Sequence, residues 1–407
     1  MLASAEVSQD RGESVETDSM PLDRVLLVSH ITDLSGPTEA LERFLRERAG
    51  LLGTIYHPFH YCVDRRSRAA IYRQGRSQWE RRRVGLGLPQ VAGFFKDVLL
   101  TLYFFAAFKV RFDVFIGANP LNAVVGIVLK RFGLVRAVIF YTIDWMPRRF
   151  ANRFLNSIYH AIDRLCVKNC DVSWNVSARI VEVRREQGLE DRRNILVPVG
   201  VRVFGAGRGG KTRRGLGKRL VLLGALAPSK GVDLVIDAYP ALKEECPELE
   251  LHVIGRTPLE RVEDGVRYEP YEPRLASLGE SVTLWGVRSH DEVMKMLPQF
   301  DVGLALYKPD RNNLSRWADP SRIKDYLACG LPVIVTDVPE IAKEIEAARA
   351  GIVIEYTAED LVRAVAQIYG QAEELEAMQA SASAYIGRFE WGNVFEEAFR
   401  QSRWALT

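Results

Sequence analysis

The segment 319–333, with the sequence DPSRIKDYLACGLPV, holds the most informative side chains of the chain. A proline and a glycine near its two ends suit the start and the C-terminal cap of a helix, and Asp319 can cap the first turn. Arg322 and Asp325 then stand about one turn apart on the same side of this helix. There the carboxylate can accept hydrogen bonds from a ribose, while the guanidinium and nearby backbone N–H groups can hold a diphosphate. A surface helix with an ordinary Arg–Asp pair is the alternative interpretation.

A lysine and two glycines form a second candidate in the loop 224–231, GALAPSKG, which follows the apolar run 219–223. Gly224 and Gly231 would let backbone amides approach phosphates, and Lys230 could neutralise charge that builds on a departing diphosphate. Arg256, at the end of the next apolar run, is a second candidate cation. The alternative is a solvated lysine at an ordinary turn.

The first half of the chain carries weaker signals. Asp144 follows the apolar run 137–141 and could act as a base on a substrate hydroxyl or hydrogen-bond a sugar. Gly36 lies just before a helical pattern whose start could meet a phosphate or a sugar. His30 also follows an apolar run. The alternatives are a turn or cap for Asp144, a plain loop for Gly36 and a structural role for His30.

These side chains need a scaffold that brings the ends of several strands together. Short runs rich in Val, Ile and Phe, each followed by a loop and a helical pattern, are typical of open parallel sheets covered on both faces by helices. Such runs lie at 24–29, 113–117, 137–141, 219–224, 249–255, 282–286, 301–306, 332–337 and 351–355. Ligands of such sheets generally bind at the carboxyl ends of the strands.

The length of the chain and a change in its composition predict two domains. A chain of 407 residues is too long for one ordinary core. A stretch rich in glycine and basic residues separates the two series of strands. We therefore expect a disordered leader at 1–22, a Rossmann-like domain at 23–200, a linker at 201–218, a second Rossmann-like domain at 219–384 and a C-terminal helix at 385–407.

The composition excludes several classes of protein. The chain is 47% hydrophobic and 26% charged, which is ordinary for a globular protein, and its net charge of +3 is too small to indicate a nucleic-acid partner. Five scattered cysteines favour a reducing cytoplasm and no zinc site. The first 22 residues lack the apolar core of a secretory signal, and the apolar stretch 98–108 is shorter than the ~20 residues that span a bilayer. We expect a cytoplasmic protein that does not cross a membrane.

A basic segment precedes that apolar stretch. Residues 64–83 contain eight arginines against two acids, and an aromatic helical pattern follows at 94–108. This combination suits docking on anionic lipid, so residues 64–108 are a candidate for peripheral contact with the inner face of the membrane. The alternative is a solvated arginine face beside a buried core helix.

The stretch PSRIKDYLACGLPVIVTD and the loop GALAPSKG resemble the donor-site helix, the following strand and the phosphate loop of family 4 and related GT-B glycosyltransferases. By this resemblance Asp325 stands where the second acid of the family contacts the donor ribose. Trp317 occupies the position of the first acid, and Asp319 lies nearby but out of register. Ala225 replaces a family arginine. Tyr307, at the end of the run 301–306, would face the cleft.

The resemblance implies an α/β fold with two doubly wound Rossmann-like domains facing across a cleft. The first domain would take the acceptor, the second would take the donor, and the C-terminal helix would return to the first domain. The implied activity is the transfer of a sugar from a nucleotide diphosphate-sugar to a saccharide or lipid-linked saccharide in the synthesis of cell-surface polysaccharide or glycolipid. Retention of configuration is implied, as is a requirement for neither metal nor organic cofactor. The catalytic candidates are Asp144, Lys230 and Asp325.

Two other functions fit the same fold. A non-catalytic relative could serve as a subunit of a polysaccharide-assembly complex, because the first acid and the loop arginine of the family are replaced. A sugar-nucleotide epimerase shares the architecture, although it would need several acids and histidines in the cleft. The whole chain has six histidines.

Overall fold

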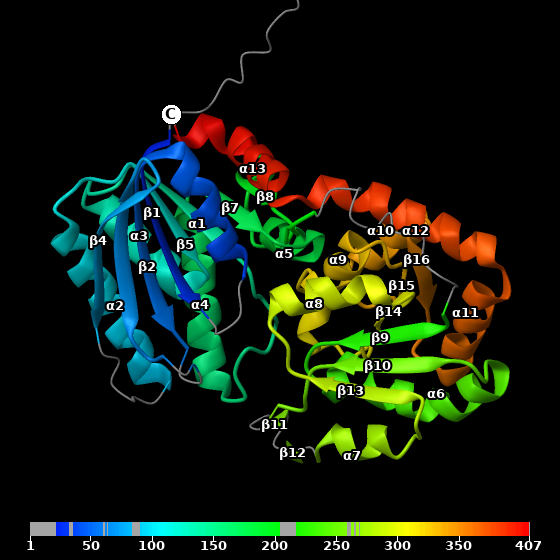
Figure 1. The fold of residues 1–407 in the computed structure, drawn as a ribbon. Coiled ribbons are helices and arrows are strands. Elements are labelled where there is room, and N and C mark those ends of the chain that lie inside the picture. The colour runs from blue at the N-terminus through cyan, green and yellow to red at the C-terminus, as the bar shows by residue number, and fades with distance from the viewer. Residues whose placement is uncertain are drawn as a thin grey trace, which may run out of the picture.

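The computed structural model describes residues 22–31, 36–59, 62, 64–83, 90–203, 217–258, 262–263, 266–267 and 269–406. These residues form two α/β domains, each built on a mainly parallel sheet with helices on both faces (Figure 1). The predicted pair of doubly wound domains is therefore confirmed. Almost all of the predicted leader at 1–22, and residues 204–216 of the predicted linker, lie outside the described residues.

The first domain contains an eight-stranded sheet in the order β4-β3-β2-β1-β5-β6-β7-β8. Its strands are β1 (Leu22–Ile31), β2 (Ala49–Pro58), β3 (Ser67–Arg73), β4 (Arg76–Arg83), β5 (Val114–Ala118), β6 (Ala137–Thr142), β7 (Val172–Asn175) and β8 (Asn194–Leu196). The β2–β3 and β3–β4 pairs are antiparallel, and the other pairs are parallel. The arginine-rich segment thus forms an edge hairpin, a place where charged strands are tolerated because one side meets water.

Two layers of helices cover this sheet. One core lies under α1 (Pro37–Arg48), α5 (Ala178–Glu186) and α13 (Trp391–Leu406). The opposite core lies under α2 (Gln90–Phe108), α3 (Pro120–Arg131) and α4 (Arg153–Asn169). The last helix, α13, packs on the first domain, where the Trp174 indole donates to the Ser402 hydroxyl over 2.9 Å.

Helix α2 is longer than the sequence indicates. The helix begins at Gln90, about two turns before the expected apolar stretch of 98–108, and has 19 residues. Within the described part of the chain, one segment, Val91–Phe108 of α2, has the length and hydropathy of a membrane span. Core helices and signal sequences can meet the same criterion, but only 22% of this segment is buried in the protein. The expectation that this stretch is too short to span a bilayer is therefore wrong on length alone.

The second domain contains six parallel strands in the order β13-β10-β9-β14-β15-β16. They are β9 (Arg219–Leu223), β10 (Glu250–Ile254), β13 (Val282–Gly286), β14 (Val302–Ala305), β15 (Val333–Thr336) and β16 (Gly351–Ile354), which confirms all six predicted runs. The helices are α6 (Val232–Glu245), α7 (Tyr271–Ala276), α8 (His290–Met296), α9 (Ser321–Ala328), α10 (Ile341–Ala347), α11 (Ala358–Gly370) and α12 (Ala372–Ile386). A small hairpin joins β11 (Val262–Glu263) and β12 (Val266–Arg267). The strand order reverses between β9 and β14, so a crevice is expected beyond the ends of these strands.

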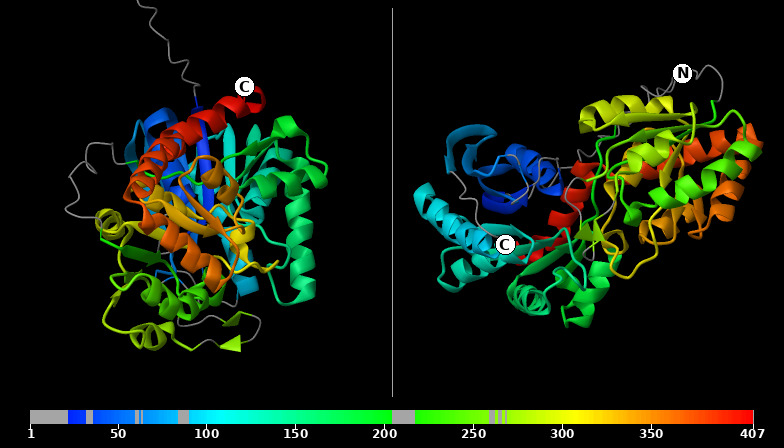
Figure 2. Two further views of the ribbon diagram at one scale, coloured as in Figure 1. Left: turned by 90° about the vertical axis from the view of Figure 1, so that its right-hand side faces the viewer. Right: turned by 90° about the horizontal axis from the view of Figure 1, so that it is seen from below.

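The two domains lie next to each other (Figure 2), and side-chain contacts join them. Arg179 at the start of α5 donates to the Glu340 carboxylate over 2.8 Å and to the carbonyl oxygens of Arg316 and Val338 over 2.9 and 2.8 Å. The indole rings of Trp145 and Trp317 meet edge to face with centroids 4.7 Å apart. Loops at the ends of strands from both domains therefore face one another.

Candidate functional site

Two cations of the second domain share the ring of Tyr307. Tyr307 directly follows β14, and Arg322 on α9 donates from Nε to its hydroxyl over 2.8 Å, with the guanidinium carbon 4.3 Å from the ring centroid. Lys230, beyond the end of β9, places Nζ 5.1 Å from the same centroid. The predicted lysine and arginine thus come together at the point where the strand order reverses. We call Lys230, Tyr307 and Arg322 the Tyr307 cluster.

The loop before α6 depends on its glycine. Gly231 has φ +75°, and a Cβ atom there would lie 2.1 Å from the carbonyl oxygen of Leu306. Any larger residue would push the loop away from β14. Lys230 Nζ donates to the Ser315 hydroxyl over 2.8 Å, which fixes the ammonium group beside Tyr307. Ser315 was not predicted, because nothing in its neighbouring sequence marks it.

Arg322 is held at the end of β9. Its Nη1 donates to the Leu223 carbonyl over 2.9 Å and lies 4.0 Å from the Cβ position of Gly224, so the guanidinium borders the predicted phosphate loop. The residue is 9% exposed, and its Nη2 is buried without a hydrogen-bond partner among the described residues. Desolvating a charged donor in this way is unfavourable unless a ligand or water accepts its hydrogen bond.

Asp325 lies one turn further along α9 and pairs with a histidine. Its carboxylate is 3.1 Å from Nε2 of His290, on the first turn of α8. The hydrogen bond to Asp325 raises the pKa of His290 above its usual value, although partial burial acts in the opposite direction. His290 was missed at the sequence level. The available signal was the capping box of Ser289 and Glu292, which marks the start of α8 just before His290.

The expectation that Asp319 caps the donor helix is wrong. Pro320 is the N-cap residue, and none of the described side chains caps this end of α9. The Asp319 carboxylate instead forms a buried ion pair with Lys324 and accepts a hydrogen bond from the Val199 N–H over 2.8 Å. It therefore stabilises the passage of the chain between the domains and is not brought to the Tyr307 cluster. Asp319 pairs with Lys324 because the buried ammonium group of that lysine requires a nearby anion.

Arg256 borders the phosphate loop from the next strand. Its side chain is exposed, and its carbonyl oxygen accepts a hydrogen bond from the Leu226 N–H over 3.0 Å. Gly255 lies so close to the loop that a Cβ there would be 1.9 Å from the Gly224 carbonyl oxygen. The ends of β9 and β10 are thus packed tightly, with the Arg256 guanidinium at the surface beside them.

Asp144 lies at the end of β6 in the first domain. It is half-buried, and its backbone N–H donates to the Asn119 side chain over 3.3 Å. The adjacent Trp145 contacts Trp317 of the second domain. Asp144 therefore belongs to the part of the first domain that faces the second, as its predicted role requires.

The other two candidate residues of the first domain, His30 and Gly36, hydrogen-bond to partners within the protein. His30 lies 3.2 Å from the Asp97 carboxylate through Nε2 and 3.0 Å from the Asn122 amide nitrogen through Nδ1. Both ring nitrogens are thus engaged, which favours the structural role for this residue. Gly36 is the N-cap of α1, and its N–H donates to the Glu39 carboxylate over 2.9 Å. The protein's own acid therefore occupies the helix start where a phosphate was considered.

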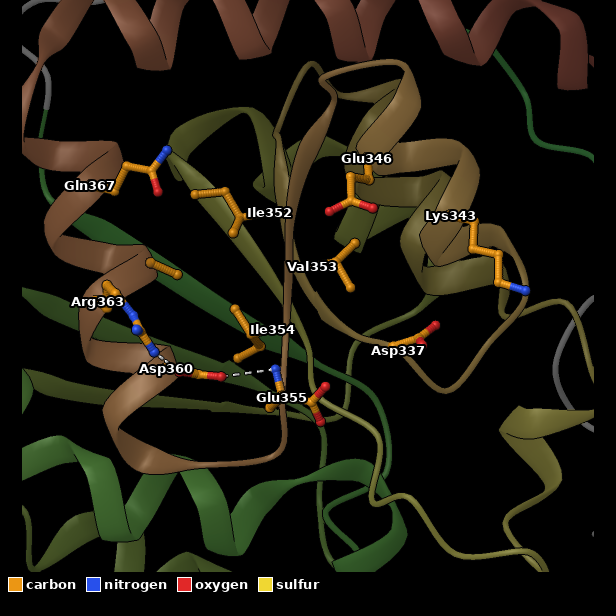
Figure 3. Close-up of a pocket in the computed structure, with 11 residues that line it drawn as sticks. Asp337, Lys343, Glu346, Ile352, Val353, Ile354, Glu355, Asp360, Arg363 and Gln367 are labelled. Carbon is orange, nitrogen blue, oxygen red and sulfur yellow. Dashed lines mark hydrogen bonds and ion pairs between the residues drawn. The ribbon is translucent and has the colours of Figure 1, made fainter.

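A cavity of about 610 Å³ lies elsewhere in the second domain (Figure 3). It runs along the edge strand β16 between α10 and α11. Acids outnumber bases in its lining, where Asp337, Glu346, Glu355 and Asp360 face Lys343 and Arg363. None of the predicted site residues contributes to it. An acidic lining is unsuited to a diphosphate, so we assign the candidate site to the Tyr307 cluster.

Part of the second domain matches a known protein family. Residues 217–371 match the family model described as glycosyl transferases group 1. The sequence matches none of the curated proteins. The matched segment includes both β9 with its loop and α9 with its preceding turn, and so contains the Tyr307 cluster.

Solved structures similar to the whole chain share its fold at low sequence identity. HepE of Anabaena in complex with UDP is 14% identical with a TM-score of 0.64, over 93% of this chain and 98% of HepE. Sucrose-phosphate synthase of Thermosynechococcus elongatus is 14% identical with a TM-score of 0.66, over 94% of this chain and 100% of that chain. The trehalose 6-phosphate synthase of Burkholderia multivorans is 13% identical with a TM-score of 0.65, over 94% and 96%. The match to glycosyl transferases group 1 thus covers the segment that holds the candidate site, and the likeness to these structures shows that the whole chain has the GT-B fold.

Proposed function

We propose that the enzyme transfers a sugar from a nucleotide diphosphate-sugar and that its diphosphate binds between Lys230 and Arg322. The observation that carries this proposal is the buried Nη2 of Arg322, which lacks a partner among the described residues and lies beside the loop at Gly224. A phosphate oxygen in that place would accept its hydrogen bond. Lys230, on the same Tyr307 ring, would neutralise the leaving diphosphate.

The remaining roles follow from position. Asp325 would accept hydrogen bonds from the ribose hydroxyls, in competition with His290. Asp144, on the facing domain, would act on the acceptor hydroxyl as a base or bind the transferred sugar. Because two protein cations can balance the charge of the diphosphate, we propose that no metal is required. Retention of configuration is part of the proposal through the likeness to family 4.

Uridine diphosphate is the first donor base to test. HepE, which shares the fold, has been crystallised with UDP, with UDP and glucose, and with UDP-glucose. At 12–14% identity this likeness supports the choice of a first ligand and leaves the transferred sugar open.

We propose a saccharide or lipid-linked saccharide as the acceptor, and a role in the synthesis of cell-surface polysaccharide or glycolipid. The enzyme would act in the cytoplasm, at the inner face of the membrane. The exposed arginines of the β3–β4 hairpin and the adjoining helix α2 support peripheral contact through residues 64–108.

One observation favours a non-catalytic GT-B subunit as the second candidate. Trp317 stands where the family has its first acid, and its indole packs against Trp145 while its carbonyl accepts a hydrogen bond from Ser177. An apolar ring therefore takes the place of a carboxylate that would face the transferred sugar. The protein would then bind a nucleotide-sugar without transferring it.

Calorimetry with uridine, guanosine and adenosine diphosphates and their sugars tests the proposal. We expect the nucleotides of one base to bind. Lys230→Ala should weaken that binding at least about tenfold through loss of a charged contact. The matched control is Lys168→Ala, an exposed lysine on α4 of the first domain, which should bind as the wild type does. Absence of binding to every nucleotide would refute the donor site.

Turnover assays distinguish the candidate functions. Transfer to saccharides or to membrane extracts supports the transferase. Donor binding without transfer across that acceptor panel supports the non-catalytic subunit. Formation of an epimer from the donor alone, followed by NMR, would indicate an epimerase.

A further inference from the structure

Helix α2 presents polar side chains to the protein interior. Asp97 and Thr101, one turn apart, are both buried. The Asp97 carboxylate pairs with His30 over 3.2 Å, and the Thr101 hydroxyl lies 2.8 Å from Nε2 of His57. These contacts tie α2 to the carboxyl ends of β1 and β2, because His30 and His57 are the penultimate residues of those two strands.

The opposite side of the same helix is apolar and faces outward. Five large side chains on it are between 36% and 70% exposed, with spacings that place them along one side of a helix. We call this set the apolar stripe: Val91, Phe95, Leu99, Leu102 and Tyr103. Among the described side chains of α2, every exposed one is uncharged. The helix is thus inverted relative to a water-facing helix, since its acid Asp97 is buried, its lysine Lys96 is largely buried and paired with that acid over 3.0 Å, and its aromatic and aliphatic groups point outward.

A basic edge adjoins the apolar stripe. The Trp79 ring on β4 meets the Phe108 ring edge to face at 5.2 Å, which places β4 beside the last turn of α2. Arg81 on β4 donates to the Tyr103 hydroxyl over 2.9 Å. Arg76 and Arg82 are also exposed on this edge strand, where Glu80 is the acid that balances part of the charge through Arg82. Arginines bordering an apolar surface complement anionic headgroups above acyl chains.

We infer that the apolar stripe inserts into the interfacial region of an anionic lipid bilayer, with α2 parallel to the membrane plane and the β4 arginines at the headgroups. The length of α2 would allow a span, but its inner side is hydrogen-bonded to the sheet. Leaving the domain would expose Asp97 and Thr101 to lipid without their histidine partners, which is unfavourable. A shallow position buries the stripe and keeps those contacts.

A docked α2 favours a lipid-linked acceptor over a soluble saccharide. This choice of acceptor rests on the proposed function as a sugar transferase. The same helix that would contact lipid holds His30 and His57 at the ligand-binding edge of the first sheet. Docking through α2 would therefore bring that edge close to the membrane surface, where the sugar of a lipid-linked acceptor lies.

Vesicle flotation of the full chain tests this placement without any substrate, so its outcome is independent of the transferase assay. The probes are vesicles of phosphatidylcholine alone and of phosphatidylcholine with roughly one third phosphatidylglycerol. We expect binding to the anionic vesicles, and we expect Phe95→Ser with Leu99→Ser to reduce it at least about tenfold, since these side chains supply much of the inserted apolar area. Arg81→Ala with Arg82→Ala should weaken binding and flatten its dependence on salt.

Controls separate docking from loss of structure and from other partners. Leu196→Ser with Val287→Ser removes two exposed apolar side chains elsewhere and should leave flotation unchanged. All variants should keep the wild-type thermal midpoint. The tryptophan fluorescence of the Leu99→Trp variant should be quenched by brominated lipid if the apolar stripe enters the bilayer.

Three results of these assays would overturn the inference. They are wild-type protein that stays with the buffer, a serine variant that floats like the wild type, and unquenched fluorescence of Leu99→Trp. Resistance to alkaline extraction would indicate a span, and a lipid-free dimer that Phe95→Ser with Leu99→Ser dissociates would indicate a second copy of the chain. Either result would also overturn it.

Discussion

Arg322 donates a hydrogen bond from Nε to the Tyr307 hydroxyl over 2.8 Å, and its guanidinium lies over the Tyr307 ring. Tyr307 follows β14 and Arg322 lies on α9, so the contact joins two elements that leave the same edge of the sheet. Burial raises the pKa of the Tyr307 hydroxyl, which keeps it neutral, and its oxygen accepts this bond. One guanidinium edge is thereby fixed, which leaves the buried Nη2 for a ligand.

Replacing Arg322 should weaken donor binding most. Arg322→Ala removes the Nη2 donor, which has no partner among the residues described, and we expect the dissociation constant for the preferred nucleoside diphosphate to rise by about 10- to 100-fold, the usual effect of losing a charged hydrogen bond. Calorimetry measures this directly. Arg363→Ala, on α11 beside the acidic cavity, is the matched control. Equal affinity for wild type and Arg322→Ala would place the diphosphate elsewhere.

Tyr307→Phe separates the orientation of Arg322 from its charge. The ring under Lys230 and Arg322 remains, and the hydrogen bond to Nε is lost. We expect a smaller loss of donor affinity than for Arg322→Ala, of about tenfold or less, because a single hydrogen bond contributes about 0.5–1.5 kcal/mol. The same titration compares the two variants. A loss as large as that of Arg322→Ala would mean that the hydroxyl itself contacts the ligand.

The buried pair of Asp319 and Lys324 should contribute to stability and leave donor binding unaffected. Asp319→Ala would leave the Lys324 ammonium buried without its anion, so we expect the free energy of unfolding to fall by about 3–5 kcal/mol. Adding Lys324→Met should recover most of this loss, since both charges of the buried pair are then removed. Urea denaturation of both variants measures the effect. If Asp319→Ala keeps full stability and loses donor affinity, Asp319 contacts the donor instead of serving as the structural partner of Lys324.

The pair of His290 and Asp325 makes a small part of the stability depend on pH. Because folding raises the pKa of His290, its contribution is fully present below the unfolded-state value of 6.5 and is lost as the pH rises through the folded-state value. His290 is about half exposed, so we expect less than about 1 kcal/mol. The difference in thermal midpoint between wild type and His290→Gln should therefore be measurable near about pH 5.5 and absent near about pH 8.5.

The same pair should affect ligand binding. If Asp325 binds the ribose, protonated His290 competes for the carboxylate, so donor affinity of the wild type should increase from about pH 6 to about pH 8. His290→Gln should show a weaker pH dependence, whereas His160→Gln on the first domain should behave as the wild type. Identical pH profiles for wild type and His290→Gln would show that His290 does not compete with the donor.

The second domain could be predicted largely from the sequence, because its strands are short, continuous apolar runs bounded by turn residues. All six predicted runs are strands, and Lys230 and Arg322, which lie near Tyr307, were candidates by residue type, by spacing and by the resemblance to family 4. The first domain was harder. Strand β2 starts directly after α1 without a turn, and the charged strands of the edge hairpin carry no continuous apolar run.

The sequence by itself determined the two-domain α/β plan and the residue types of the candidate site, since hydrophobic pattern, glycines and helix ends are local properties. Only the tertiary structure decided which charged groups pair. Asp319 pairs with Lys324 away from the site, and His290 on a different helix pairs with Asp325. Arg322 retains one donor that has no partner within the part of the chain that the structure describes. The sequence likewise does not indicate which side of α2 is buried against the sheet and which is exposed. Such pairings depend on burial and on contacts between residues far apart in the chain, which local spacing does not encode.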